Sequence, residues 1–122
     1  MVYIEVGIAT IASFVFGWIW YGPLFGKEWA KENKLKPSKK PEPKKLFYHL
    51  LTTILLVFFF SMLLQGSMID MIRIAFIAWI GFFVSTKLGS MIWMKQSWKL
   101  FWIDIVYHLI NLNLIAIVIA QF

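Results

Sequence analysis

Several polar side chains stand close together in an otherwise apolar stretch near the C-terminus, FWIDIVYHLINLN. At 100° per residue along a helix, Asp104, Tyr107, His108 and Asn111 fall within about 100° of one another. They form one polar stripe, whereas Asn113 lies on the opposite face and predicts a second contact. Asp and His change charge near neutral pH, so the stripe has the chemistry of a proton or ion relay. The alternative is that its hydrogen bonds only hold helices together.

An ionised carboxylate within a membrane needs a partner, because exposing it to lipid costs about 2.5–3.5 kcal/mol at the bilayer centre. His108 is one helical turn from Asp104, a spacing that allows contact. His49 follows Lys45 about as closely as Asp104 follows Lys99, so that both enter the membrane to a similar depth. We therefore expect a cluster of Asp104 with His49 and His108. No pair of His or Glu ligands has the spacing of a metal site on one helix, and neither a metal nor another cofactor is predicted.

The composition places these residues in a membrane protein. Hydrophobic residues make up 61% of the 122 residues, and only 15% are charged. In soluble domains, about half of the residues are apolar and about a quarter are charged. The absence of cysteine excludes disulfides, thiolate metal ligands and cysteine nucleophiles. The net charge of +6 comes from lysines grouped between apolar segments, which indicates a membrane surface and no nucleic acid as the partner.

Four apolar segments have the length of about 20 residues that crosses a bilayer as a helix. The sequence predicts one all-α membrane domain, a four-helix bundle over residues 1–122, with spans at residues 4–21, 46–64, 68–87 and 100–122. The third span is the least regular, because Arg73 and Lys87 leave only a short uncharged stretch between them and a helix running on towards Trp93 is an alternative. The second and fourth spans begin with similar tetrapeptides, KLFY and KLFW, which suggests a parallel internal repeat or merely shared interface chemistry.

Charge in the loops predicts the orientation. The connection GKEWAKENKLKPSKKPEPKK carries eight lysines against three glutamates, and Lys95 and Lys99 lie in the third connection. Both connections fall on the same side of a four-span chain. The positive-inside rule then gives two basic cytoplasmic loops and both termini outside, in a multi-pass protein of the cell (inner) membrane.

Two helix faces carry small residues at every fourth position, which favours close helix packing in lipid. We expect the two faces to pack against each other within the monomer; a contact between copies in a homo-oligomer is the alternative. The faces consist of Ala9, Ser13 and Gly17 in the first span and of Gly81, Ser85 and Gly89 in the third, where Ala78 shares the same face.

The loop at residues 23–45 is rich in lysine and proline and has no apolar face. Attraction to anionic lipid headgroups is worth about 1 kcal/mol for each basic residue near the surface. The expected headgroup contacts are Lys34, Lys36, Lys39, Lys40, Lys44 and Lys45.

The segment GWIWYGPLFGKEW, together with Trp79-Ile80-Gly81-Phe82 and WKLFWID further on, resembles the DUF1761 family of small bacterial membrane proteins. The likeness extends over nearly the whole chain apart from the lysine-rich insert. It implies a four-helix membrane domain. The family has no known function, so that the resemblance implies no site residue.

Two functions fit these patterns. The first is a small homo-oligomeric channel or proton- or ion-coupled transporter that uses the polar stripe. The second is a non-transporting structural or accessory subunit that packs against another membrane protein. No nucleophile–base pair or phosphate-binding loop is seen, so no enzymatic activity is predicted, and an intramembrane enzyme is the third choice.

Overall fold

The computed structural model describes residues 2–32 and 43–122, and the described chain is helical nearly throughout. The elements in chain order are α1 (Val2–Ile19), η1 (Trp20–Leu24), α2 (Gly26–Glu32), α3 (Pro43–Leu63), α4 (Met68–Ala78), η2 (Trp79–Val84), α5 (Ser85–Met94) and α6 (Trp98–Ala120), where η marks a π-helical segment.

Four helical stretches are long and apolar enough to cross a membrane: Tyr3–Leu24, Pro43–Leu63, Met68–Met94 and Trp98–Ala120. The all-helical architecture with four such helices is therefore confirmed. The third helix is longer than the predicted span, because α4, η2 and α5 continue one another as far as Met94. Lys87 consequently lies inside this helix, about 10 Å before its end.

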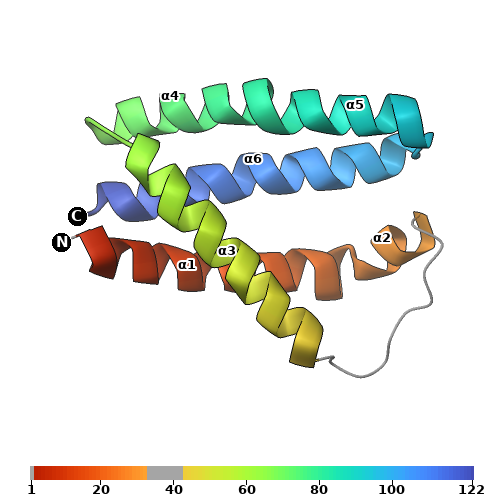
Figure 1. Ribbon diagram of the computed structural model, residues 1–122, viewed down its shortest axis with the longest axis horizontal. Helices are drawn as coiled ribbons and strands as arrows, with labels where there is room; N and C mark the ends of the chain where they lie inside the picture. The colour runs from red at the N-terminus through yellow and green to blue at the C-terminus, as the bar shows by residue number, and fades with distance from the viewer. Residues whose placement is uncertain (1, 33–42) are drawn as a thin grey trace.

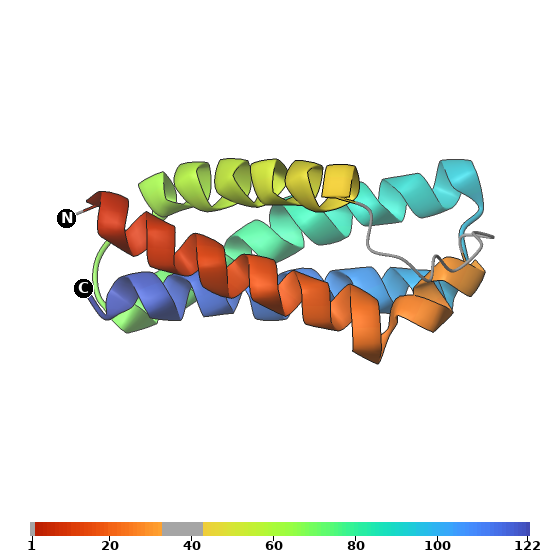
Figure 2. The same cartoon turned by 90° about the horizontal axis from the view of Figure 1, so that it is seen from below.

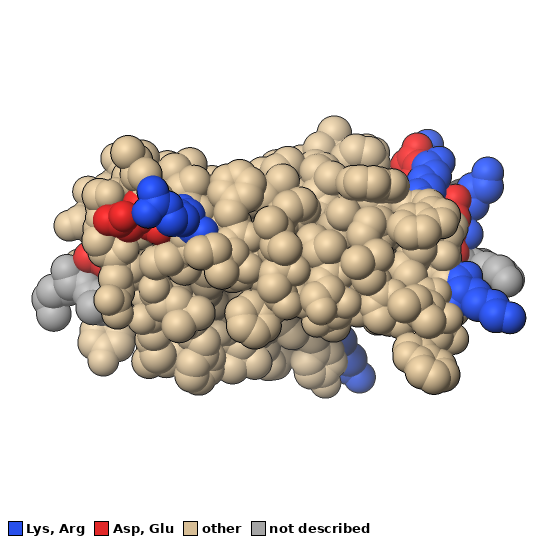
Figure 3. Space-filling model, turned by 90° about the horizontal axis from the view of Figure 1, so that it is seen from above, with Lys and Arg blue, Asp and Glu red and all other residues tan. Residues whose placement is uncertain are grey.

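The last helix, α6, is the centre of the bundle. It lies between the α4–α5 helix on one side and α1 on the other, while α3 crosses the bundle diagonally (Figure 1). Both termini lie at one end, and α2 lies at the opposite end, which we call the α2 end (Figures 1 and 2). Lys, Arg, Asp and Glu gather mostly near the two ends and leave a broad uncharged belt between them (Figure 3). Their orientation relative to a membrane stays a prediction.

The half of the bundle near the termini has an entirely apolar core. It joins α1, α3, α4 and α6 through buried hydrophobic side chains, and its centre is fully closed to solvent at Ala9, Val57, Ala75 and Leu112. Thr10, which is buried beside it, turns its hydroxyl back onto its own helix and donates to the Val6 carbonyl. The described core of this half is therefore built from hydrophobic side chains.

Two π-helical segments interrupt the α-helices in the first and third spans. Each begins at the tryptophan of a Trp-x-Gly tripeptide, at Trp20 and at Trp79. Pro23, which has no backbone N–H, lies within η1, and the Phe25 N–H donates to the Trp20 carbonyl five residues earlier, at 2.9 Å. Each half of the chain thus contains a helix, a π segment, a second helix and a long partner helix, the order that a parallel duplication would produce.

Capping residues fix the two short turns. Ser67 caps α4 in a reciprocal capping box, in which the Asp70 carboxylate accepts from the Ser67 N–H at 3.0 Å. Lys95 ends α5 in the left-handed conformation, with φ of 50°, and Ser97 caps α6 two residues later. These caps set where α5 and α6 begin to run back along each other, and so the level at which Lys87 meets Asp104.

Candidate functional site

Asp104 is the centre of a charged cluster inside the bundle. Lys87 Nζ lies 2.7 Å from Asp104 Oδ2, and the Tyr21 hydroxyl donates to Asp104 Oδ1 at 2.7 Å. The Lys87 and Asp104 side chains are only 22% and 13% exposed. Both carboxylate oxygens therefore have a partner, as a charge placed within a membrane requires.

These partners differ from the expected histidines. Lys87 comes from α5 and Tyr21 from η1, whereas His49 stacks on Phe14 at a ring distance of 5.0 Å. The sequence predicts a third span that ends at Lys87, with a helix running on towards Trp93 as the alternative. The structure has the longer helix, which extends to Met94 and carries Lys87 to the level of Asp104 on α6. The sequence does not single out Lys87 as a partner of Asp104, because that contact depends on how two helices pack.

His108 lies next to this pair but uses its ring differently. The ring packs on Phe83 at 4.5 Å and on Tyr107 at 5.0 Å. Its Nδ1 atom is buried and has no hydrogen-bond partner among the described residues. A buried polar atom without a partner is costly, so that this nitrogen indicates a place for water or a ligand.

Asn111 continues the stripe one turn deeper. Its Oδ1 accepts a hydrogen bond from the buried Ser13 hydroxyl of α1 at 2.7 Å, a contact between residues of two spans. Its Nδ2 is buried without a partner in the described part of the chain. Asn113 does not need the second contact surface that its position predicted, because its amide donates to the Leu109 carbonyl of its own helix at 2.8 Å.

Tyr107 belongs to an aromatic layer around the site. It is buried with Trp20 and Ile103, stacks on Phe16 at 5.4 Å and meets Tyr21 edge-on at 4.9 Å. This layer holds Tyr21 in position to donate to Asp104.

Gly17 is where α1, α3 and α6 come together. A Cβ atom added there would lie 2.9 Å from the Tyr107 hydroxyl and 3.0 Å from the His49 ring. Only glycine leaves room for both rings at this point, which explains the small residue physically. His49 is thereby brought beside Tyr107 and into the lining of a cavity, and not to Asp104.

Three partly open cavities meet at His108. The first, of about 310 Å³, is lined by Lys87 and by neighbouring residues of η2 and α5; the second, of about 330 Å³, reaches Tyr21, Trp29 and Asp104. The third, of about 350 Å³, extends deeper, and all three include His108 in their lining. The residues lining the third are Ser13, Tyr21, His49, Thr52, Thr53, Leu56, Phe83, Tyr107, His108 and Asn111. The charged pair therefore lines the second cavity, and His108 and Tyr21 connect that cavity to the third, which reaches Asn111.

The two small-residue faces do not pack against each other. Ala9, Ser13 and Gly17 are buried where α1 meets α3 and α6. Of the third-span face, Ala78 is buried in the apolar core, but Gly81 and Ser85 are exposed and Gly89 is half-buried. The central α6 separates the two helices, which is why the expected pairing within the monomer does not occur.

Only part of the expected lipid-binding segment can be placed. Lys44 and Lys45 are exposed at the start of α3. Lys34, Lys36, Lys39 and Lys40 lie outside the described residues.

In the described part of the chain, no three His, Asp or Glu side chains gather into a group that could hold a metal ion. The polar cluster instead offers one cation, one carboxylate, two imidazoles and several hydroxyls. Such a set can bind a charged group and exchange protons.

Fold and site together define a small multi-span α-helical membrane protein with a charged site inside its bundle. The chain belongs to the DUF1761 family, described as "Protein of unknown function", whose model matches residues 4–120. This match confirms the resemblance seen in the aromatic and glycine motifs. No curated protein and no solved structure matches the chain.

Proposed function

We propose that the protein is a proton-coupled transporter of a small solute, in which Asp104 takes up and releases the proton. The observation that carries this proposal is the ion pair between Lys87 and Asp104 in the lining of a cavity whose wall also includes His108, the residue shared with two further cavities. Charged side chains inside a membrane domain are costly and occur mainly where ions or substrates pass.

The two halves of the bundle support a carrier more than a channel. The half at the α2 end holds the cavities and the polar side chains, while the core of the other half consists of hydrophobic residues. A channel needs a continuous polar path, whereas a carrier is open to one side at a time. The two π segments provide places where the first and third helices can bend.

Asp104 is suited to the role of proton carrier because its interaction with Lys87 depends on whether the carboxylate is protonated. Protonation of the carboxylate would remove the attraction to Lys87 and release an ammonium group into the adjoining cavities. The proton would thus change which group faces the solute. A carrier of this kind works within one chain and does not require a pore between copies.

The accessory-subunit function stays as a second candidate because of the exposed third-span face. Gly81 and Ser85 are open on the bundle surface, and a Cβ atom added at Gly81 would meet nothing within 4 Å. A second membrane helix could approach closely there. Stoichiometric co-purification with another membrane protein, lost in Gly81→Leu, would favour this candidate.

Proton flux into proteoliposomes tests the transport proposal. A pH-sensitive dye is trapped inside, the outside is acidified in the presence of a deproteinised cell extract as the source of solutes, and valinomycin with K⁺ on both sides clamps the potential. We expect faster internal acidification than in empty liposomes, loss of the excess in Asp104→Asn, and retention in Asp70→Asn. Equal rates for wild type and Asp104→Asn would overturn the proposal.

A further inference from the structure

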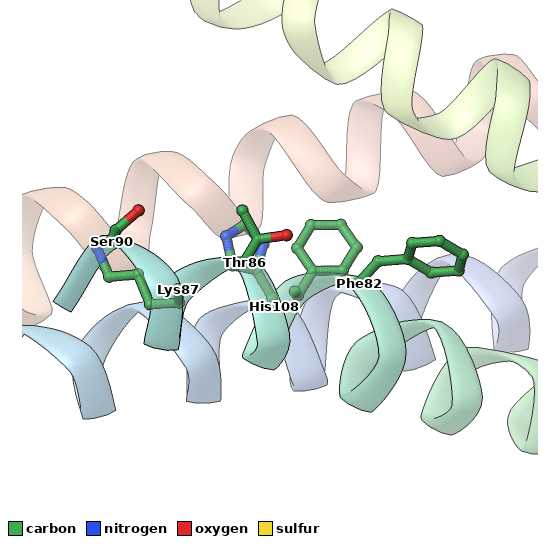
Figure 4. A pocket seen from close by; sticks show the side chains of 6 residues that line it. Phe82, Thr86, Lys87, Ser90 and His108 are labelled. Carbon is green, nitrogen blue, oxygen red and sulfur yellow. The ribbon is translucent and has the colours of Figure 1, made fainter. Parts of the chain in front are cut away.

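The cavity beside Lys87 is amphipathic. Its lining has a polar part, with Lys87, Thr86, Ser90 and His108, and an aromatic part, with Phe82 and Phe83. Ser90, Lys87, Thr86 and Phe82 follow one another along the same helical stretch, so that polar groups stand at one end and a ring at the other (Figure 4). This arrangement matches a ligand with a polar head and an apolar tail.

The polar part of the cavity suits an anion. Lys87 lines both this cavity and the neighbouring one that contains Asp104, so that a single ammonium group serves both. An ammonium has three N–H donors, and its contact with Asp104 Oδ2 occupies one direction. The hydroxyl groups of Thr86 and Ser90 add donors, and His108 brings the buried Nδ1 that has no partner in the described residues.

The apolar part of the cavity faces the surroundings of the bundle. The Phe82 side chain is 68% exposed, on a helix whose length and composition suit it to a membrane. Lys87 lies about 10 Å inside the end of that helix, a depth near the boundary between headgroups and acyl chains. A ligand with its head on Lys87 could therefore extend its tail along Phe82 among the acyl chains.

We propose that this cavity binds the head of a monoanionic amphiphile, with Lys87 as its counter-ion, and that this molecule is the solute carried together with the proton. The binding site stands by itself, and its role in transport rests on the proposed function. The shared chemistry is a single negative charge on a chain of hydrocarbon, whether it belongs to a membrane lipid or to a free single-chain amphiphile.

Charge balance explains the coupling. In the empty site, Lys87 is neutralised by Asp104. When one proton binds to Asp104 Oδ2 and one anion binds to Lys87, the site is again neutral, whereas a proton alone or an anion alone leaves one unbalanced charge. Because an unbalanced charge in a low-dielectric interior is costly, only the empty and the doubly loaded forms change conformation readily. The other titratable groups facing this exchange are Tyr21 from η1 and His108 and Tyr107 from α6.

Octanesulfonate is the binding probe, because it stays an anion at all working pH values and does not cross bilayers as a neutral acid. Its binding to the purified full chain in a neutral maltoside detergent is measured by calorimetry. Asp104→Asn frees Lys87 from its competitor, so that we expect binding about tenfold tighter than in wild type. The double variant Lys87→Gln/Asp104→Asn, which leaves no unpaired charge, should bind at least about tenfold more weakly than wild type. Lys99→Gln, which removes an exposed lysine at the same end, should bind as wild type does.

Comparison probes decide the ligand class. Octyltrimethylammonium, with the opposite charge, should not bind above the level of the double variant. Inorganic phosphate that displaces octanesulfonate at equal concentration would overturn the amphiphile proposal, as would unchanged octanesulfonate binding in the double variant. Displacement by phosphatidylglycerol supports a membrane lipid as the natural source, and its failure to compete supports a free single-chain amphiphile.

The same variants separate this inference from the proposed function. In proteoliposomes, external octanesulfonate should accelerate proton entry in wild type and not in Asp104→Asn, although the variant binds the probe more tightly. Binding with the expected variant pattern but without any Asp104-dependent proton flux would overturn transport and leave the binding site standing. Asp104-dependent proton flux without binding of the probe would overturn the site and leave transport standing.

Discussion

Trp20 and Trp79, the first residues of the two π segments, both donate their indole N–H to backbone carbonyls of α6 on either side of Asp104 in the chain. Trp20 Nε1 lies 3.2 Å from the Ile103 carbonyl and Trp79 Nε1 lies 2.7 Å from the Ile105 carbonyl. Carbonyls two residues apart point about 200° apart around a helix. The first and third helices thus bind α6 from different sides. These two hydrogen bonds fix the position and rotation of α6 and therefore the position of Asp104.

Removal of one indole donor should weaken this fixation. We expect Trp79→Phe, which keeps an aromatic ring, to lower stability by about 0.6–1.5 kcal/mol, the range for a hydrogen bond in a membrane bundle. Thermal unfolding in detergent measures the effect. Trp98→Phe, at an exposed tryptophan at the start of α6, is the matched control and should leave the melting temperature unchanged. An equal shift in both variants would contradict the role of the Trp79 bond.

The strength of the Lys87–Asp104 ion pair can be measured by comparing the stability of the two single variants with that of the double variant. Lys87→Gln or Asp104→Asn alone leaves one charge without its partner and should destabilise the bundle by up to about 3 kcal/mol. The double variant keeps neutral, hydrogen-bonding side chains and should recover part of that loss. The two single losses adding up in the double variant would mean that the charges do not interact.

A comparison with Asn113 tests whether the contacts of Asp104 with other helices stabilise the bundle. Asn113→Ala removes only a hydrogen bond to the Leu109 carbonyl of the same helix. It should lower the melting temperature much less than Asp104→Ala, which removes contacts to two other spans. Equal shifts in thermal unfolding would contradict the interhelical role of Asp104.

Two glycines provide an internal control for close packing. Gly17→Ala forces a methyl group against the Tyr107 hydroxyl and the His49 ring and should destabilise by about 1–3 kcal/mol. Gly81→Ala meets nothing within 4 Å and should be neutral or slightly stabilising, because alanine favours helix formation. Melting temperatures of the two variants in the same detergent give the comparison, and a stabilising Gly17→Ala would contradict the three-helix contact.

Cysteine labelling tests the predicted orientation in the membrane. The chain has no native cysteine, so that single cysteines can be read without background. In intact cells a membrane-impermeant maleimide should label Ser67→Cys, at the turn between α3 and α4, and should label Lys44→Cys only after permeabilisation. The reverse pattern would place the termini in the cytoplasm and overturn the positive-inside assignment.

The sequence was sufficient for the features that depend on composition and periodicity. Four apolar segments of membrane length predict the four long helices, and a period of 3.6 places Asp104, His108 and Asn111 on one stripe. The structure shows Asp104 and Asn111 each bonded to another helix and His108 lining all three cavities. The prediction of four long helices succeeds because it needs only one helix at a time, whereas the role of the stripe stays a prediction.

Features that depend on which helices pack together could not be predicted from the sequence of each helix alone. The predicted third span ends at Lys87, with a longer helix as the alternative; the helix does continue, and an acidic partner on α6 makes the buried position of Lys87 tolerable. The position of Gly17 at a three-helix contact likewise depends on the diagonal course of α3 (Figure 1). Neither π segment is marked by a hydrophobic periodicity in the sequence from which it could be predicted.

The apolar core near the termini has an electrical consequence. A cavity lined by polar side chains extends into the bundle towards Asn111, so that we expect the membrane voltage to fall chiefly across the apolar half. If Asp104 carries the proton as proposed, it would lie outside that voltage drop, and the voltage would have little influence on its proton exchange. Any net charge moved past the Ala9–Leu112 core would instead experience most of the drop, about 2.3 kcal/mol per elementary charge at 100 mV. A cycle that crosses this region only in neutral forms would run at the same rate in energised and in depolarised cells.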